Sequence, residues 1–543
     1  MRSRAVQLPT TRPQLLDAAG RPIVSASSSS SVTAPRGPSY PGGGHGRRFT
    51  GFPSSATGVN TALLGNLEVM RDRSRALLRS SPRIKKAVRA YRANVVGTGI
   101  KPRSQVKDRA LRDQIHELFN DWQEDADAAG RTDFYGLQSL GIQTYMPSGE
   151  VFYRFRPRRP EDGFAVPLQI ECLEPDFCPI WYSATAPNGN MVRAGVEFDG
   201  IGRRTAYWMY RSHPGEFGPW TLGGLMGQLD LVRVPASEVL HLYEVTRPGQ
   251  IRGEPPLATV LIRAHDKEIY DDAQMMRQKI GALFAAMVST PEENALGETD
   301  AGDGTADLTL EPGIVGKLPP GSDVTFSNPP QLGTEYAKFQ REVNLDICGG
   351  IGVTYEQGTG DMTGVNYSSA RVALLDFRRE VTQFIFNVLV PAFCRPVWRR
   401  WMTDAVTSGA LTIPGFEKNP RPFLRATWTP QGWQWVDPIK EAESAKMSVR
   451  CGFTSRDDQI VEQGDDPEEL DERIAAGQKR ADALGLVFDS DPRQTAPGNI
   501  SGAALGADAG EAPPAEQPQG DEQAPSSSVP ATAPKKKKGK VAA

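Results

Sequence analysis

Two very long amphipathic patterns restrict the fold of this 543-residue chain more than any other feature of its sequence. Over residues 256–289 the apolar side chains recur at helical spacing, which predicts a helix about 50 Å long. Its stripe consists of Ile262, Ile269, Ala273, Met276, Ile280, Phe284 and Met287. A second long helix is predicted over 366–401, kinked at Pro391 or Pro396, and a shorter one over 334–348. Such helices become stable by packing on neighbours, so the pattern indicates an assembly.

The overall composition is that of an ordinary water-exposed protein. The formal net charge is -3, with 23% charged and 39% hydrophobic residues, so any contact with nucleic acid has to be local. The length allows two to four structural units. The most apolar run, 381–398, is interrupted by polar residues and prolines, and we expect no membrane span.

The five cysteines argue against a disulfide framework or a structural zinc site, because they are odd in number, scattered and never spaced as CxxC. We therefore expect a reducing compartment. The start of the chain lacks an apolar signal-peptide core. The tails 1–60 and 488–543 are rich in Ser, Pro, Gly, Gln and Ala, and we expect both to be disordered.

The region 71–103 carries eleven basic residues against one acidic residue. Ser81 and Pro82 predict the start of a helix that Gly97 ends. This face can neutralise phosphates, or it can be a solvated or subunit-facing surface. The second interpretation is favoured, since no aromatic platform is interleaved with the charges.

The chain is predicted to be α+β around its long helices. The stretch EVFYRFRP alternates like a strand, and two β-rich runs flank DGIGR, which indicates a hairpin. Residues 437–487 return to helix. Within them, Thr454 followed by Asp457 resembles a capping box, and Asp466 with Pro467 marks a further helix start.

A glycine-rich stretch, GTGDMTGVNYSSAR from position 358, raises the question of nucleotide binding. A Walker A loop needs Lys and then Ser or Thr after its last glycine, but Gly364 is followed by Val365 and Asn366. A dinucleotide fingerprint needs a preceding strand, yet the preceding segment is predicted to be helical. These residues do not support a nucleotide site.

No other pattern identifies a catalytic residue, a metal site or a cofactor. The five histidines form no HExxH pair, and there is no GxSxG motif. The acidic pairs 271–272 and 457–458 suit magnesium in a nuclease only if other groups join them, because adjacent helical residues point about 100° apart. We therefore expect no enzyme, no cofactor and no metal.

The order of several separated segments resembles the lambda-type tailed-phage portal proteins. The segments are RSRALLRSSPRIKKAVRAYRANVVGTGIKPR, LHLYEVTRPGQIRGEPPLATVL, EPGIVGKLPPGSDVTF, GDMTGVNYSSARVALLDFRRE and WVDPIKEAESAKMSVRCGFTSRDD. Together they span about residues 65–470. The two tails and the loop 290–307 match poorly, so nothing is carried onto them.

The resemblance implies a portal-type fold assembled as a ring, usually a dodecamer, at one capsid vertex. Double-stranded phage DNA would enter and leave through its channel, and terminase, capsid or scaffold proteins and head-completion or tail proteins would dock on it. The ring would assemble in the bacterial host cytoplasm and stay in the virion. The implied parts are an N-terminal helix and α+β wing (61–255), stem helices (256–289 and 333–348), a clip (290–332), a tunnel loop (349–366), a spine helix (367–402), a wing β segment (403–436) and a helical crown (437–487).

Two sets of site residues follow from the resemblance. The tunnel-loop residues expected to face DNA are Gly358, Thr359, Gly360, Asp361, Thr363, Gly364 and Asn366. They offer hydroxyls, an amide and backbone freedom without a cation, which suits weak, sequence-blind contacts with moving DNA, and Asp361 would repel the phosphates slightly. A simpler interpretation is a mobile surface loop, with Asn366 capping the next helix in either case. The terminase-facing clip residues are expected to be Lys317, Pro319, Pro320 and Asp323.

Two rival functions remain open from the sequence. A monomeric DNA-binding protein would use the basic 71–103 region and show steep salt dependence. A metal-dependent nuclease would need carboxylates clustered in space.

Overall fold

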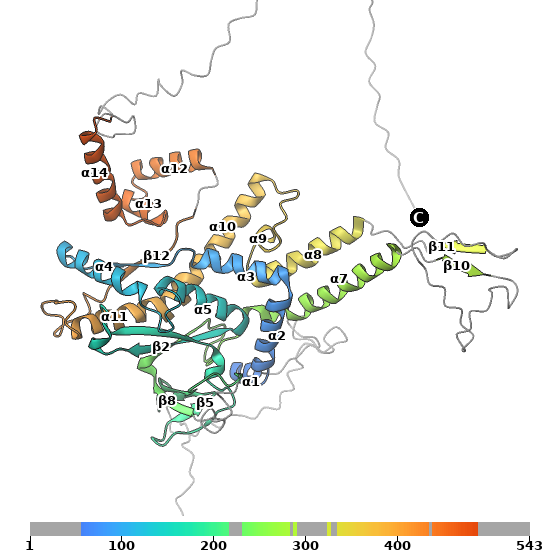
Figure 1. Cartoon of the computed structure of the whole chain (residues 1–543), viewed down its shortest axis with the longest axis horizontal. Coiled ribbons are helices and arrows are strands. Elements are labelled where there is room, and N and C mark those ends of the chain that lie inside the picture. The colour runs from blue at the N-terminus through green and yellow to red at the C-terminus, as the bar shows by residue number, and fades with distance from the viewer. Residues whose placement is uncertain are drawn as a thin grey trace, which may run out of the picture. The chain divides into compact units, whose positions relative to one another are not determined.

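The computed structural model describes residues 56–216, 231–282, 286–289, 323–326, 334–433 and 437–486 (Figure 1). The chain divides into two compact units, one ending at Gln431 and the other beginning at Gly432. Both expected tails lie outside the described residues, except for 56–60. No helix in the described part is long and apolar enough to cross a membrane.

The first unit begins with helices and mixes them with strands throughout. The helices are α1 (Val59–Leu64), α2 (Leu67–Ser80), α3 (Pro82–Val95), α4 (Arg109–Glu124) and α5 (Phe134–Ser148). Ser81 and Pro82 begin α3 as predicted, although the Ser81 side chain makes no capping hydrogen bond. The α+β expectation is confirmed at the level of a mixed helix and sheet structure.

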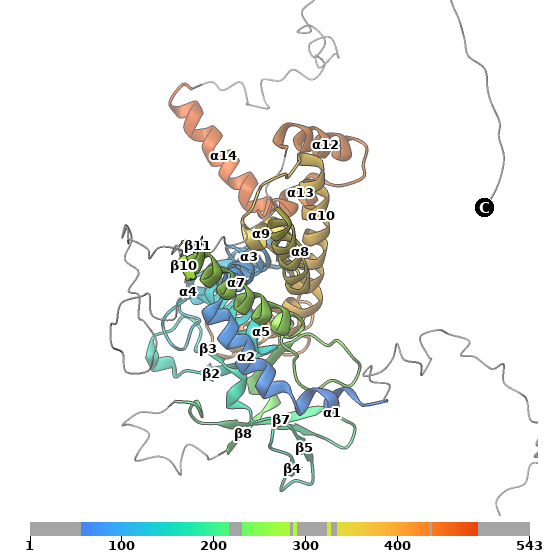
Figure 2. The ribbon, with the colours of Figure 1, turned by 90° about the vertical axis from the view of Figure 1, so that its right-hand side faces the viewer.

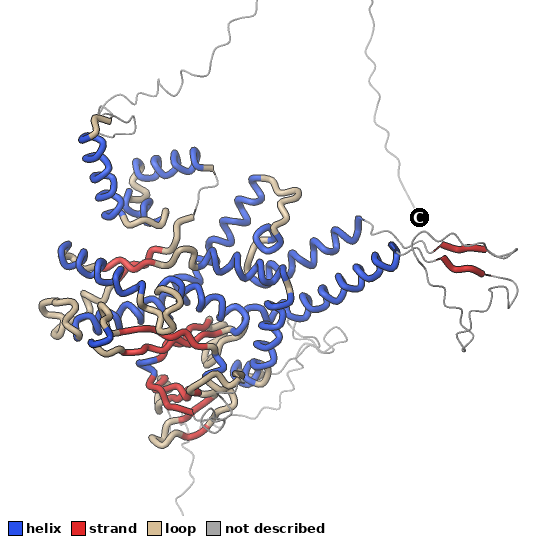
Figure 3. Tube along the Cα trace, viewed as in Figure 1, coloured by secondary structure: helices blue, strands red, loops and turns tan. Residues whose placement is uncertain are grey.

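Antiparallel sheets follow α5 (Figure 3). A three-stranded sheet has the order β3-β2-β9, from β3 (Leu168–Leu173), β2 (Glu150–Pro157) and β9 (Val239–Tyr243). A five-stranded sheet runs in chain order through β4 (Ala184–Thr185), β5 (Met191–Arg193), β6 (Val196–Phe198), β7 (Arg204–Tyr210) and β8 (Leu231–Pro235). The predicted strand is β2, and the predicted hairpin around DGIGR is formed by β6 and β7.

The long helices form the second half of this unit. A short 3-10 turn, Pro256–Val260, leads into α7 (Leu261–Ala282), and α8 (Thr334–Ile351) lies beside α7 in Figure 1. The short helix α9 (Tyr355–Thr359) packs against α3 and α8 (Figure 2). Then α10 (Tyr367–Phe384), a π-helical segment (Ile385–Cys394) and α11 (Arg395–Thr407) follow without a break. Pro391 has no N–H to donate and lies inside the π segment, where the hydrogen-bond ladder shifts.

One predicted helix is wrong at its C-terminal end. Residues 286–289, expected in the helix 256–289, form strand β10 (Ala286–Ser289), which pairs antiparallel with β11 (Asp323–Phe326). Met287 continues the helical stripe in the sequence, but β pairing with a segment far along the chain decides the conformation of 286–289.

A buried aromatic cluster joins α4, α5, β2 and α11. Phe119 contacts the rings of both Trp398 and Trp401, at centroid distances of 5.3 and 5.0 Å. Phe134 stacks on Phe393 of the π-helical segment, which also contacts Tyr153 of β2. These side chains are almost fully buried. The last strand, β12 (Ala426–Thr429), pairs with β1 (Lys101–Ser104), which closes the first unit near its C-terminal end.

A buried ion network ties the three-stranded sheet to α2 and to the segment before α7. The carboxylate of Glu150 accepts from Arg71 at 2.9 Å, from Arg252 at 2.9 and 3.0 Å, and from the backbone N–H of Gly253 at 2.8 Å. His241 Nε2 lies 2.8 Å from Glu150 Oε2, the oxygen that also accepts from Gly253. Burial disfavours charge on Glu150, but Arg252 and His241 hold the pKa of its carboxyl well below its usual range.

The second unit is helical, as expected, with α12 (Pro438–Arg450), α13 (Arg456–Glu462) and α14 (Pro467–Ala483). The capping box is displaced by one residue from the predicted Thr454 and Asp457: it consists of Ser455 and Asp458, each of which accepts a hydrogen bond from the other's backbone N–H. Asp466 caps α14 ahead of Pro467 as predicted.

Candidate channel loop

The glycine-rich stretch is in large part helical. Gly349 and Gly350 lie inside α8, and Gly358 and Thr359 lie in α9, so the expected loop over 349–366 is wrong for these residues. A Cβ at Gly350 would collide with Val260, which indicates that this glycine serves close packing and not backbone freedom. The irregular segment between α9 and α10 is 360–366, and we call it the channel loop.

Helix α9 begins and ends with local hydrogen bonds that define the start of the loop. Thr354 and Gln357 form a capping box at its N-terminus, with distances of 3.3 and 3.4 Å. At its C-terminus Gly360 adopts a left-handed conformation with φ of 80°, which glycine takes without a steric cost. The chain therefore leaves α9 at Gly360 in a fixed direction.

Asp361 holds the first half of the loop. Its carboxylate accepts from the Thr363 backbone N–H at 2.9 Å and from the Tyr355 hydroxyl at 3.0 Å. The hydrogen bonds from Thr363 hold the pKa of this carboxyl below its usual value. The guanidinium of Arg341 lies 4.6 Å from the Tyr355 ring centroid and 3.9 Å from the Asp361 carboxylate.

Asn366 closes the loop by capping α10, as predicted. Its side-chain oxygen accepts from the Ser369 backbone N–H at 2.9 Å. Between the two anchors, Met362, Thr363 and Gly364 are exposed. Gly364 also has a positive φ, 75°, so the tip of the loop depends on a second left-handed glycine.

The structure brings five of the seven predicted tunnel-loop residues onto this loop, namely Gly360, Asp361, Thr363, Gly364 and Asn366. Gly358 is buried, and a Cβ there would collide with the Cys348 sulfur. Thr359 donates its hydroxyl proton to the Tyr355 carbonyl at 2.7 Å. These two residues belong to the packed base of the loop.

Two cations at the base of the loop were missed by sequence reasoning. Arg341 lies beside Asp361, and the ammonium of Lys86 occupies the space that a Cβ at Gly360 would need. Lys86 is on α3 and Arg341 on α8, so only the packing of α3, α8 and α9 brings them here. No short-range pattern in the sequence signals this neighbourhood.

The predicted clip residues cannot be placed in the same way. Lys317, Pro319 and Pro320 lie outside the described residues. Asp323 is the first residue of β11, opposite Ser289 of β10.

Four of the eleven basic residues of the 71–103 region make contacts inside the chain. Arg71 is buried against Glu150, Arg75 pairs with Asp176, Arg83 pairs with Asp271 at 2.9 Å, and Arg92 donates to Gln143 at 3.1 Å. These contacts weaken the interpretation of the region as a DNA-binding face, because the paired groups are not available to phosphates.

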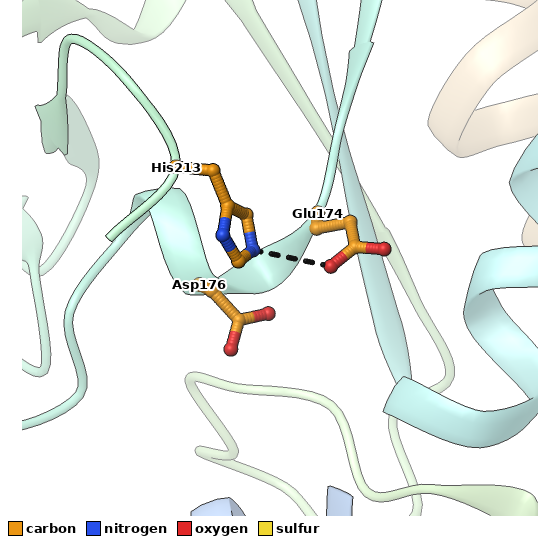
Figure 4. A group of neighbouring side chains, drawn as sticks. All are labelled: Glu174, Asp176 and His213. Atoms are coloured by element: carbon orange, nitrogen blue, oxygen red, sulfur yellow. Dashed lines mark ion pairs between the residues drawn. The ribbon is translucent and has the colours of Figure 1, made fainter. Parts of the chain in front are cut away.

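Within the described residues, one group has the composition of a metal site: Glu174, Asp176 and His213 (Figure 4). His213 Nε2 lies 3.3 Å from Glu174, but Arg75 lies 3.2 Å from Glu174 and 2.5 Å from Asp176. Burial raises the pKa of Asp176, yet the hydrogen bond and charge of Arg75 leave it below its usual value. Arg75 therefore supplies the positive charge that a metal ion would bring.

Among the described residues, the acidic pairs 271–272 and 457–458 considered for a nuclease do not form such a group either. Asp271 accepts from Lys267 at 2.7 Å and from Gln340 at 2.7 Å, besides its pair with Arg83. These contacts join α7 to α8 and α3, so Asp271 has a structural role.

Comparison with known proteins decides the family. The model of the family described as phage portal protein, lambda family, matches residues 45–384, more than half of the chain. The chain belongs to this family. A portal protein forms the channel through which phage DNA is packaged and ejected, and it is a structural protein of the virion. The matched residues include the channel loop.

Individual relatives agree with the family. The probable portal protein of Halomonas phage phiHAP-1 is 30% identical over 453 residues, covering 80% of this chain and 84% of that protein. Portal protein B of Escherichia phage lambda is 20% identical over 512 residues, covering 84% and 93%. A solved structure, the neck of a native GTA particle computed with C12 symmetry, is 14% identical with a TM-score of 0.40, covering 72% of this chain and 93% of that one.

Proposed function

We propose that this portal protein assembles with copies of itself into a ring, with twelve subunits as the expected number, and that the channel loop faces the DNA. The observation that carries the proposal is the match to the portal family across residues 45–384, which includes the loop. The ring sits at one capsid vertex after assembly in the host cytoplasm.

The chemistry of the loop supports this position. Its exposed residues, Met362, Thr363 and Gly364, carry no charge, and the charge of Asp361 is engaged by Tyr355 and Thr363. A tip without cations makes weak contacts with phosphates, because strong binding to DNA depends on cationic side chains that displace the counterions of the phosphates. The two nearby cations, Lys86 and Arg341, are exposed beside the base of the loop and not at its tip, and Arg341 lies over Tyr355.

The remaining partners follow from the family and are part of the proposal. Terminase docks on the segment 313–330, which contains Lys317, Pro319, Pro320 and Asp323, and supplies the energy for packaging. Capsid or scaffold proteins and head-completion or tail proteins bind the same ring. The portal itself catalyses no reaction in this scheme.

Two measurements test the proposal separately. Negative-stain electron microscopy with mass photometry shows whether the purified chain forms rings with a central hole. For the loop, a photo-crosslinking residue at Thr363 is expected to react with DNA held in the channel, and the same residue at exposed Thr185 on β4 is not. A monomeric chain would contradict the ring, whereas equal DNA crosslinking at both positions would contradict only the position of the loop.

A further inference from the structure

A concave site lined by four arginines lies beside α11 in the first unit. Arg395 and Arg399 come from α11, and Arg421 and Arg425 come from the segment just before β12. The concavity has a volume of about 560 Å³, and Trp398 forms part of its wall. We call these four residues the arginine pocket.

The arginine pocket has no counter-charge within the described part of the chain. None of its four guanidinium groups has an ion pair or a side-chain hydrogen bond there, and all four residues are exposed. Neighbouring Arg400, by contrast, pairs with Glu238 and Asp404. Trp398 is 1% exposed, and its indole Nε1 also has no hydrogen-bond partner among these residues.

Four like charges around one concavity repel each other, and Arg395 and Arg399 are also one helical turn apart, where like charges destabilise a helix. Such an arrangement indicates an anionic partner from outside the chain. Guanidinium groups bind carboxylates and phosphates in a forked geometry, so both chemistries fit the charge.

A complementary surface lies on α4 of the same chain. Its outer face carries the acidic stripe, formed by Asp113, Glu117, Asp121 and Glu124. All four are exposed, and the last three have no ion pair or side-chain hydrogen bond to any described residue. The stripe is unfavourable for α4 alone, because like charges recur at successive turns and two of them lie at the negative C-terminal end of the helix dipole.

The acidic stripe cannot be turned inward. At about 100° per residue it lies opposite the face of α4 that carries Ile115, Phe119 and Trp122. Those three residues are buried, and Phe119 packs on Trp398 and Trp401 of α11. The packing of the first unit therefore leaves the stripe on the surface.

We propose that the arginine pocket of one subunit binds the acidic stripe of α4 in the neighbouring subunit. This contact joins two different surfaces of the same chain, the head-to-tail arrangement that closes a ring. Glu117 and Asp121 are about 6 Å apart along α4, which matches the spacing of Arg395 and Arg399 on α11. The inference rests on the ring assembly proposed above.

The observations favour this partner over single-stranded nucleic acid. Trp398 and Trp428, the aromatic residues of the pocket, are 1% and 8% exposed and so offer no platform on which bases can stack. Three of the four carboxylates of the stripe, those of Glu117, Asp121 and Glu124, moreover, have no ion pair with any described residue. Duplex DNA binding at the pocket is the competing outcome of the test.

Charge reversal provides the test. The variants are Arg395→Glu with Arg399→Glu, called the basic variant, and Glu117→Lys with Asp121→Lys, called the acidic variant. Each is expected to lose rings in mass photometry at physiological salt while keeping its circular dichroism spectrum. The matched control reverses two exposed arginines of the five-stranded sheet region, Arg193→Glu with Arg203→Glu, and should assemble like the wild type.

Combinations of these variants make the test specific. Mixing the basic and acidic variants pairs the unchanged pocket of one with the unchanged stripe of the other, and the Glu-bearing pocket with the Lys-bearing stripe, so rings of alternating variants are expected to form although neither variant forms them alone. The chain that carries all four reversals restores the contact with exchanged charges and should regain rings.

Three results would overturn the inference. A basic variant that assembles normally excludes the contact while leaving the ring proposal intact. Assembly-competent basic variants that bind duplex DNA more weakly, with a salt slope lower by about two, would assign the pocket to phosphates. A wild-type chain that stays monomeric would overturn the ring proposal and this inference together.

Discussion

Arg252 donates from Nε to both carboxylate oxygens of Glu150, at 2.9 and 3.0 Å, and neither side chain is exposed. The pair joins the start of β2 to the segment that leads into α7, so the sheet and the long helices share one buried charge pair. A carboxylate in this position depends on its cations, because water does not reach it.

The first prediction is that Arg252→Met strongly destabilises the fold. Removing Arg252 takes away the cation that donates most hydrogen bonds to buried Glu150 and leaves Arg71 as the remaining arginine of the network, so the free energy of unfolding should fall by about 3–5 kcal/mol. Urea denaturation at fixed protein concentration and equal assembly state measures this change. The control, Arg203→Met, alters an exposed arginine and should change stability little. A loss below about 1 kcal/mol for Arg252→Met would show that the network contributes little.

The second prediction concerns pH and His241. Arg204 can only donate, and it lies 3.0 Å from Nδ1, so Nδ1 accepts and the Nε2–H of neutral His241 donates to Glu150. Burial lowers the pKa of His241 to about 4, despite the nearby carboxylate and with Arg204 and Arg252 opposing protonation. The unfolded chain binds a proton near its ordinary pKa of about 6.5, which the folded chain does not.

Stability is therefore lost as the pH falls from about 6.5 toward 4, by at most about 3 kcal/mol from this residue. The lowered pKa of Glu150 acts in the same direction at still lower pH. As the pH falls over this range, the Tm of His241→Gln should decrease less than the Tm of the wild type. The control His265→Gln, on the exposed side of α7, should lose as much Tm as the wild type. Identical pH profiles for wild type and His241→Gln would contradict the prediction.

The third prediction separates two glycines that look alike in the sequence. Gly358→Ala should destabilise the protein by about 1–3 kcal/mol, because its Cβ would collide with Cys348 in a packed site. Gly349→Ala, in α8 with open space around it, should be neutral or stabilising by up to about 1 kcal/mol. The double variant Gly358→Ala with Cys348→Ala should recover stability relative to Gly358→Ala alone. Additive losses would exclude this steric explanation.

These cases show which parts of the fold can be predicted from sequence. The cap at Asn366, the start of α3 at Pro82 and the hairpin of β6 and β7 depend on neighbours along the chain, and the sequence predicts all three. Gly349 and Gly350 look like loop residues in the sequence, but both lie in helix α8. Val260 approaches Gly350 so closely that a side chain would not fit there, which explains the glycine at position 350.

Non-local contacts account for what the sequence does not predict. Strand β10 exists because it pairs with β11, although its residues continue a helical pattern. Lys86 and Arg341 reach the channel loop from separate helices. The Glu150 network joins Glu150 to residues that are 79 to 103 positions away. Hydrophobic periodicity carries no information about such charge pairs, so they have to be read from the structure.

The fourth prediction concerns the group Glu174, Asp176 and His213. Arg75 already neutralises its carboxylates, so a chelator such as EDTA should leave the Tm unchanged. Arg75→Ala should lower the Tm. If the site is built for an arginine side chain, added magnesium should not raise the Tm of this variant back to the wild-type value. A Tm that falls with EDTA and recovers with a divalent cation would reopen the metal interpretation and, with magnesium-dependent DNA cleavage, the nuclease.

The fifth prediction tests the chemistry of the channel loop. Thr363 is exposed between the anchors Asp361 and Asn366, so Thr363→Arg places a cation at the tip and keeps both anchors, with loss of the Thr363 side-chain hydrogen bond to Asp361. An arginine there binds passing phosphates through charge-assisted hydrogen bonds and slows the DNA. DNA packaging by rings of this variant should be slower than by wild-type rings, and the difference should shrink as salt is raised, since screening weakens the contact.

Thr185→Arg, on the five-stranded sheet, adds the same charge and should package at the wild-type rate. Equal rates for all three proteins, with rings intact, would mean that the tip does not meet the DNA.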